Sequence, residues 1–260
     1  MKTGLKDPRP GAIPLRFATY VDYSKLPTPP PEFGHMHLIE DWGMLGNDTY
    51  GDCAPVGGIH QTEYFCALGQ TDAPFSTETA LKNYSEITGF SLVDPQGVPY
   101  PLDRPNPTDK GTDLGDLAAH WQNVGLVDDN GKRHKIVAAV DFNPGDLREL
   151  WVASYLFTVT LGFALPDSAE EQTQRGLPWD VVPGATIVGG HCVPAFSKLA
   201  HYGVGVTWGQ PQLFTPRFFQ TYNNQGFVGF SEEMLHDAKS IDGFDDALLR
   251  DDLAELAKAA

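Results

Sequence analysis

The chain has 260 residues, of which 41% are hydrophobic and 11% aromatic, a composition typical of a globular rather than a disordered protein. Its formal net charge of -16 argues against nucleic acid or an anionic membrane as a partner, because both are bound by basic surfaces. Three cysteines are too few for a disulfide framework, and no apolar run suggests a membrane span or a secretory signal, so we expect a cytoplasmic protein.

Residues 1–36 are rich in proline and are expected to form an extended arm, because proline fixes φ and removes backbone donors. The arm could be a disordered leader, or a strap that packs on the body of the protein or on a partner. Its aromatic residues Phe17, Tyr20, Tyr23 and Phe33 favour the strap, since their side chains gain free energy by burial.

Residues 37–125 are expected to form a helical lobe. Proline near the start of the first helix and glycine after its end are typical helix boundaries. Gly57 and Gly58 inside this helix cost about 1 kcal/mol each relative to alanine, so we expect another backbone to pass close to them. The predicted helices cover residues 53–68, 77–88 and 113–124, and a long loop covers residues 91–110.

A β-rich lobe is expected at residues 126–230, followed by an acidic tail at 231–260 that ends in an amphipathic helix. Helices in the first half and antiparallel-looking strands in the second predict an α+β protein of two lobes. The predicted strands of the second lobe cover residues 134–142, 156–165, 185–196, 203–209 and 226–230, and its predicted helices cover residues 144–156 and 215–222.

Cys53 is the strongest candidate nucleophile. It lies where a loop enters the first predicted helix, and the amide dipoles of a helix N-terminus favour a thiolate. Cys66 is expected to be a small buried hydrophobic residue. Cys192 follows His191 in a predicted strand, so its side chain should point away from that imidazole. A buried structural thiol remains the alternative interpretation of Cys53.

His191 is the candidate base, in a strand behind Gly189 and Gly190, which leave space for a substrate backbone in front of the ring. His35 and His37 could form a metal-binding pair, but no second cluster with ligand spacing accompanies them, so we expect no metal and no cofactor. A metal-dependent hydrolase would rest on scattered side chains alone. Two further histidines are interpreted as solvated surface residues, namely His120 and His134.

The segments NDTYGDC, GGHC and VTWG, in this order, resemble the papain-like cysteine peptidases over about residues 40–230. In that family a cysteine opens the central helix of the first lobe, and the histidine lies on a strand of the second. A more detailed resemblance, at residues 42–53, 180–184 and 206–209, is to papain-like proteins encoded by actinobacteria and their phages. The resemblance implies a papain-like two-lobed fold.

The resemblance also implies a role for each matching residue. Cys53 would be the nucleophile, and His191 the base that takes its proton and returns it to the leaving group. Asn47, six residues before Cys53, would form an oxyanion hole with the Cys53 backbone amide. Trp208 matches the tryptophan that shields the third catalytic group from water.

The third catalytic group is where this sequence departs from the family. Val206 stands where the family has asparagine, and its side chain makes no hydrogen bond. Thr207 is adjacent, but in a regular strand it points to the opposite face, and a bulge would be needed to turn it inward. Thr207 is therefore the candidate for the group that orients His191.

Two functions follow from these residues. The first is a papain-like thiol hydrolase that cleaves a bond in a peptide or protein substrate, or a related amide, through Cys53 and His191. The second is a catalytically weak or inactive structural or binding protein with the same fold, for example a phage virion component whose arm contacts a protein partner. A phage-encoded protein would be located in the host cytoplasm or in the virion.

Overall fold

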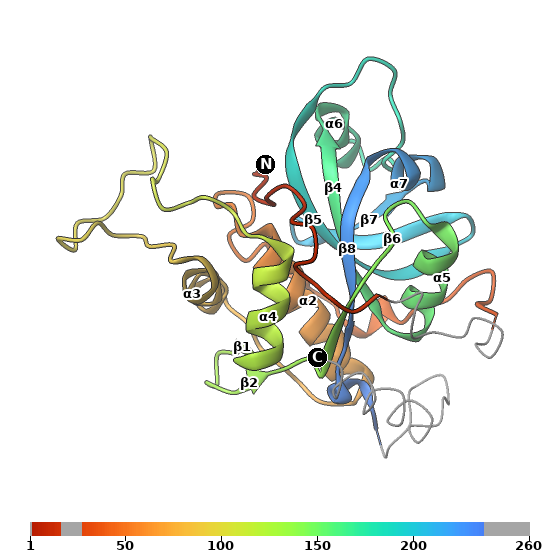
Figure 1. Cartoon of the computed structure of the whole chain (residues 1–260), viewed down its shortest axis with the longest axis horizontal. Coiled ribbons are helices and arrows are strands. Elements are labelled where there is room, and N and C mark those ends of the chain that lie inside the picture. The colour runs from red at the N-terminus through yellow and green to blue at the C-terminus, as the bar shows by residue number, and fades with distance from the viewer. Residues whose placement is uncertain (1, 17–27, 237–260) are drawn as a thin grey trace.

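The computed structural model describes residues 2–16 and 28–236, shown in colour in Figure 1. Three of the aromatic residues of the arm, Phe17, Tyr20 and Tyr23, lie outside the described residues, and so does the helix expected in the acidic tail. The helices are α2 (Cys53–Leu68), α3 (Thr77–Thr88), α4 (Leu114–Asn123), α5 (Leu147–Leu156), α6 (Asp167–Gln174) and α7 (Pro216–Tyr222), with short 3-10 helices η1 (Met36–Leu38) and η2 (Glu232–Met234).

The strands form one large and one small antiparallel sheet. The large sheet has six strands in the order β3-β8-β4-β5-β6-β7, and β1 pairs with β2 in the small one. The strands are β1 (Leu126–Val127), β2 (Arg133–His134), β3 (Ala138–Asp141), β4 (Thr158–Pro166), β5 (Ile187–Leu199), β6 (Tyr202–Thr207), β7 (Gln210–Phe214) and β8 (Asn223–Phe230).

The helices of the first lobe end where local signals predict. Ser76 caps α3, because its hydroxyl accepts a hydrogen bond from the Thr79 amide, and Gly89 ends that helix in the left-handed conformation at φ 76°. Asp113 caps α4 in the same way. In the second lobe α5 begins three residues later than predicted, because Asp146 rather than Pro144 supplies the cap.

Three elements of the second lobe were not predicted from the sequence, namely the strands β1 and β7 and the helix α6. The strand β7 contains Pro211. Proline is tolerated there because β7 is the edge strand of the sheet, where one side of the backbone needs no partner. The acidic helix α6 follows β4 and was also missed.

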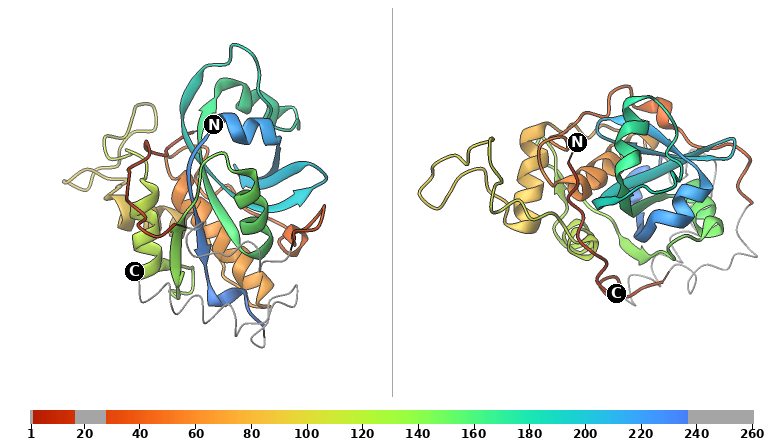
Figure 2. Two further views of the ribbon diagram at one scale, coloured as in Figure 1. Left: turned by 45° about the vertical axis from the view of Figure 1, so that its right-hand side comes forward. Right: turned by 90° about the horizontal axis from the view of Figure 1, so that it is seen from above.

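Figure 1 shows α2, α3 and α4 beside the large sheet, and Figure 2 shows α2 lying between the other two helices and the sheet. Almost every residue of α2 is buried, because the helix is covered by α3, α4 and β5. A side chain at Gly57 would meet Cys192 and Pro194 of β5. The expectation that another backbone passes close to Gly57 and Gly58 is therefore wrong, since the neighbours are side chains.

The architecture is thus α+β, with helices first and an antiparallel sheet second, as predicted. Within the described part of the chain, no helix combines the length and the apolar character that crossing a membrane requires. The packing of α2 against β5 brings the helix that begins at Cys53 next to the strand that carries His191.

Candidate active site

Cys53 is the first residue of α2, and its side chain is 2% exposed. Burial raises the pKa of the Cys53 thiol to about 12, because the interior disfavours the charged thiolate. Hydrogen bonds from the backbone amides of Cys192 and Gly4 oppose this shift without overcoming it. The thiol is therefore protonated at neutral pH in this conformation.

His191 lies on β5 and is completely buried. Its Nε2 is 2.6 Å from the Thr207 hydroxyl oxygen, and its ring stacks on Trp208 with the centroids 4.6 Å apart. Its other ring nitrogen, Nδ1, is buried without a hydrogen-bond partner among the described residues. Burial lowers the pKa of His191 to about 3, so the ring is neutral.

A tight turn explains how Thr207 and Trp208 both reach this ring. The strand β6 ends at Thr207, and the next two residues, Trp208 and Gly209, have φ angles of 49° and 72°. Positive φ at both central residues is typical of the type I′ turn that joins two antiparallel strands. Thr207 is still paired with Gln210, so it contacts His191 from a regular position of β6 without a bulge, and the turn that follows places Trp208 against the same ring, while Val206 is buried in the core.

Cys53 begins α2 and His191 lies on β5, and these two elements pack against each other. The backbone amide of Cys192, the residue next to His191, is among the groups that lower the pKa of the Cys53 thiol, so the sulfur lies near this part of β5. Because His191 Nδ1 makes no hydrogen bond, the thiol and the imidazole are not joined in this conformation. A thiol–imidazole bond requires a local rearrangement of one of the two side chains.

Asn47, the predicted oxyanion donor, is buried and is turned towards Asp52. Its side-chain amide donates a hydrogen bond of 3.1 Å to Asp52 Oδ1. Burial raises the pKa of Asp52 to about 8, against an ordinary value of 3.8. A negative charge on Asp52 would also raise the pKa of the neighbouring Cys53, so the loop before α2 does not by itself favour a thiolate.

The start of the chain lies across the candidate site. We call residues 2–6 the cleft strap. Leu5 pairs with Gly190 of β5 on one side and with Thr112, before α4, on the other. The Leu5 amide donates to Gly190 O at 2.9 Å, and the Thr112 amide donates to Gly4 O at 2.8 Å. The space in front of the two glycines before His191, expected to receive a substrate backbone, is filled by the strap: the Leu5 backbone lies against Gly190 and the Thr3 side chain against Gly189.

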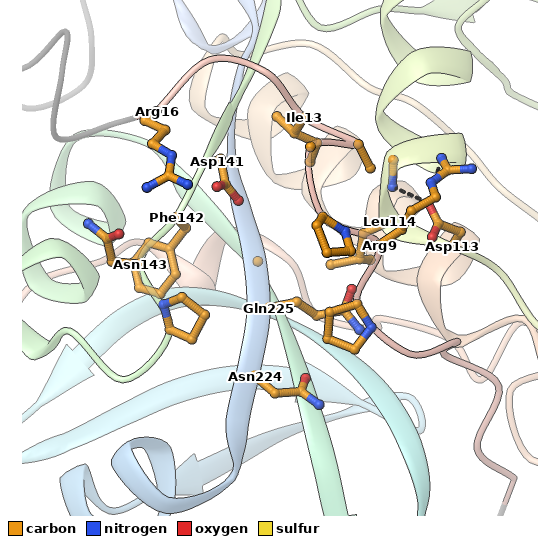
Figure 3. A pocket seen from close by; sticks show the side chains of 17 residues that line it. Arg9, Ile13, Arg16, Asp113, Leu114, Asp141, Phe142, Asn143, Asn224 and Gln225 are labelled. Atoms are coloured by element: carbon orange, nitrogen blue, oxygen red, sulfur yellow. Dashed lines mark hydrogen bonds and ion pairs between the residues drawn. The ribbon is translucent and has the colours of Figure 1, made fainter.

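The rest of the described arm also packs on the body. Arg9 forms ion pairs with Asp113 and Asp116 of the α4 region, at 2.9 and 2.8 Å. Figure 3 shows the pocket that the arm creates beside β3 and β8, with Arg9 and Asp113 on one side and Arg16 and Asp141 on the other. Neither Cys53 nor His191 lines this pocket. Residues 2–16 thus pack on the body of the protein as a strap.

A second thiol–imidazole pair lies at the far end of α2, where Cys66 Sγ is 3.7 Å from His134 Nδ1. The interpretation of His134 as a solvated residue is wrong, because its side chain is 0% exposed. Thirteen residues of helix separate Cys66 from Cys53, which is about 20 Å. No local signal in the sequence indicates this cluster, since it is closed by Glu233 from the end of the described chain.

No model of a known protein family matches the chain, and no curated protein matches it. Solved structures do match its fold. A cysteine protease of Xylella fastidiosa, xylellain, shares 12% identity over 88% of this chain and 91% of its own, with a TM-score of 0.56. Procathepsin B S9 of Trypanosoma congolense shares 11% identity over 88% of this chain and 86% of its own, with a TM-score of 0.57. A ragweed pollen cysteine protease in its proform, Amb a 11, shares 14% identity over 81% of this chain and 69% of its own, with a TM-score of 0.53.

Identities this low establish the fold and nothing beyond it. All three matched proteins are named as cysteine proteases or cathepsins, and each match extends over both lobes of this chain. The chain therefore has the papain-like two-lobed α+β fold.

Proposed function

We propose that the protein is a papain-like thiol hydrolase that cleaves a peptide bond or a related amide bond, with Cys53 as nucleophile and His191 as base. The observation that carries the proposal is the environment of His191. Thr207 and Trp208 hold the ring and leave one ring nitrogen unused, on the strand that packs against the helix beginning at Cys53.

The hydrogen bond to Thr207 supplies the tautomer that the reaction needs. When Nε2 carries the proton and donates it to the Thr207 oxygen, the lone pair of Nδ1 is free to accept the thiol proton. The thiolate of Cys53 then attacks the carbonyl carbon of the substrate, and His191 gives the proton to the leaving amine. Water hydrolyses the resulting thioester, and the free thiol is restored.

The negative oxygen of the tetrahedral intermediate requires donors that point at it. The backbone amide of Cys53 and the side-chain amide of Asn47 are the donors we assign to this role. Asp52 accepts one hydrogen bond from the Asn47 amide, which fixes the orientation of that amide and leaves its second N–H for the substrate oxygen.

The cleft strap supports an extended peptide as the substrate. Its backbone is paired on two sides, by Gly190 and by Thr112, so the groove accepts a chain in β conformation. The same pairing keeps the thiol buried and neutral, so a substrate must replace the strap before reaction. We infer that the described conformation is a resting state.

The alternative is a structural or binding protein with little or no activity, including the role in a phage virion that the sequence resemblance suggests. The buried, protonated state of Cys53 favours this alternative, because a reactive thiolate is usually stabilised by positive neighbours and none is among the groups that shift the pKa of this thiol. In that case the arm would serve to contact a protein partner.

Labelling of the full chain with an electrophilic peptide, followed by mass spectrometry, distinguishes the two functions. A hydrolase should be labelled at Cys53, and the substitution His191→Ala should reduce the rate at least about tenfold. Cys66 and Cys192 are buried thiols in the same molecule and serve as internal controls. The hydrolase proposal is wrong if Cys53 in the folded protein, with the strap displaced as described in the Discussion, reacts no faster than in the urea-unfolded chain.

A further inference from the structure

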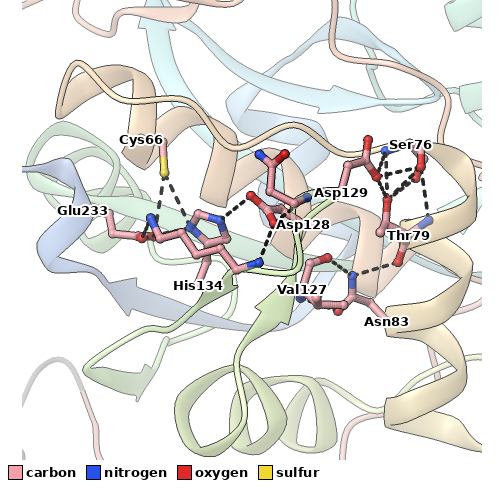
Figure 4. A network of polar contacts seen from close by, with 11 residues as sticks. Cys66, Ser76, Thr79, Asn83, Val127, Asp128, Asp129, His134 and Glu233 are labelled. Carbon is pink, nitrogen blue, oxygen red and sulfur yellow. Dashed lines mark hydrogen bonds and ion pairs between the residues drawn. The ribbon is translucent and has the colours of Figure 1, made fainter.

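Three side chains that offer metal-ligand atoms converge at the end of α2 that is far from Cys53. Figure 4 shows Cys66 of α2, His134 of β2 and Glu233 of η2 pointing towards one another. One ligand atom from each of them lies within 4.8 Å of the other two. Cys66 and His134 are fully buried, and the Glu233 side chain is 23% exposed. Three segments that are distant in the sequence therefore meet at this cluster.

We propose that Cys66, His134 and Glu233 bind a divalent cation of the zinc class. A thiolate, an imidazole and a carboxylate are the ligands that Zn²⁺ takes in proteins, with distances of about 2.0–2.3 Å. A tetrahedron with these bond lengths places its ligand atoms about 3.3–3.6 Å apart. The sulfur of Cys66 is 3.7 Å from His134 Nδ1 and 3.8 Å from Glu233 Oε2, close to this spacing.

The third distance between ligand atoms is shorter, since the Glu233 carboxylate lies 2.9 Å from His134 Nδ1, which is the length of a hydrogen bond. An ion between the two would replace the shared proton and move the carboxylate by a few tenths of an ångström. Glu233 can make this movement because its side chain is partly exposed. The same exposure provides access for a water molecule as the fourth ligand.

Neighbouring groups hold each ligand in the orientation that a cation requires. The second ring nitrogen of His134, Nε2, is 3.3 Å from Asp128 Oδ2, and such a carboxylate on the outer nitrogen is characteristic of metal-bound histidines. Asp128 is itself held by the backbone amides of Asn130 and Lys132. The Lys132 ammonium contacts Glu233 Oε1 at 2.9 Å, which leaves Oε2 for the cation.

The charges of the cluster balance when a divalent cation is present. The Cys66 thiolate and the Glu233 and Asp128 carboxylates together carry three negative charges, and the ion and the Lys132 ammonium together carry three positive charges. The bound ion would join the end of α2 to the β1–β2 hairpin and to η2. The backbones already approach closely there, because a side chain at Gly69 would collide with the Glu233 carbonyl oxygen. The function of the ion would be to clamp these segments together, apart from the candidate active site.

The test is titration of the chelator-treated full chain with Zn²⁺ by calorimetry, and with Co²⁺ by absorption spectroscopy. We expect one ion per chain and a thiolate-to-cobalt charge-transfer band. Cys66→Ala should abolish the band, whereas Cys53→Ala, which removes a buried thiol at the other end of the same helix, should keep it. Asp128→Asn should weaken Zn²⁺ binding about 10–100-fold.

Two further variants keep the test decisive. Glu233→Gln changes a partly exposed ligand, so a folded variant is expected even if Cys66→Ala fails to fold, and its Zn²⁺ affinity should fall at least tenfold. His37→Ala removes the exposed half of the other histidine pair and should leave the affinity unchanged. The proposal is overturned if the wild-type chain binds no Zn²⁺ at one ion per chain, or if Glu233→Gln binds Zn²⁺ within threefold of wild type.

Discussion

The substitution Gly4→Val should displace the cleft strap and expose the Cys53 thiol. A Cβ atom at Gly4 would collide with the backbone oxygen of Gly51, and a Cβ at Gly111 would in turn meet Gly4. The strap therefore fits its groove only with glycine at this position. Valine at position 4 does not alter the residues that we assign to catalysis.

The size of the effect follows from the hydrogen bonds that the strap loses. Gly4 donates to Gly190 O at 3.2 Å and accepts from the Thr112 amide at 2.8 Å. Each backbone hydrogen bond stabilises by about 1 kcal/mol net, so losing both should weaken the strap by about 2 kcal/mol. Since about 1.4 kcal/mol corresponds to a tenfold change in an equilibrium constant, the open fraction should rise about 30-fold.

The assay is the rate of alkylation of Cys53 by iodoacetamide at neutral pH, followed by mass spectrometry. When the strap opens and closes faster than the reagent reacts, the rate is proportional to the open fraction and should also rise about 30-fold. Asp7→Ala is the matched control, because Asp7 is an exposed residue of the same arm just outside the strap. Equal rates in wild type, Gly4→Val and Asp7→Ala would refute the view that the strap protects the thiol.

Three further predictions concern single side chains around the site. In the strap-displaced protein, Thr207→Val should slow the labelling of Cys53 by a peptide electrophile about tenfold, because it removes one hydrogen bond to His191. Thr207→Ser keeps the hydroxyl and should restore the labelling rate. Equal rates in the strap-displaced protein and in its two variants, Thr207→Val and Thr207→Ser, would show that the hydroxyl does not orient the ring. Trp208→Ala should reduce the free energy of urea unfolding by about 3–5 kcal/mol, since the indole is buried against His191 and Trp179. A reduction of the unfolding free energy below about 1 kcal/mol would contradict this packing. Asp52 binds its proton more tightly in the folded state, where its pKa is about 8, than at the ordinary value of 3.8, so its contribution to stability should fall as the pH rises from about 4 to about 8. Between pH 5 and pH 8, the free energy of urea unfolding should decrease less for Asp52→Asn than for wild type. Identical decreases in the two proteins would contradict a raised pKa of Asp52 in the folded state.

Local signals in the sequence predict the parts of the fold that depend on neighbouring residues. The bounds of α2 and α3 follow from prolines, caps and glycines within a few residues of each helix end, and the structure confirms them. The order of helices and strands likewise predicts the α+β class. The proximity of Cys53 to the strand of His191 was inferred from a resemblance, because no local signal indicates which helix packs on which strand.

The sequence by itself determined where α2 and α3 begin and end, that Cys53 opens one of them, and that helices precede strands, because these features arise from interactions between near neighbours in the chain. Only the tertiary structure decided the rest. The packing of β5 and β6 in one sheet brings Thr207 to His191, and the strap depends on pairing between Leu5, Thr112 and Gly190. Likewise, His134 is buried because Glu233 reaches it from 99 residues away. Contacts between distant segments depend on the packing of the whole chain, and no short stretch of sequence specifies them.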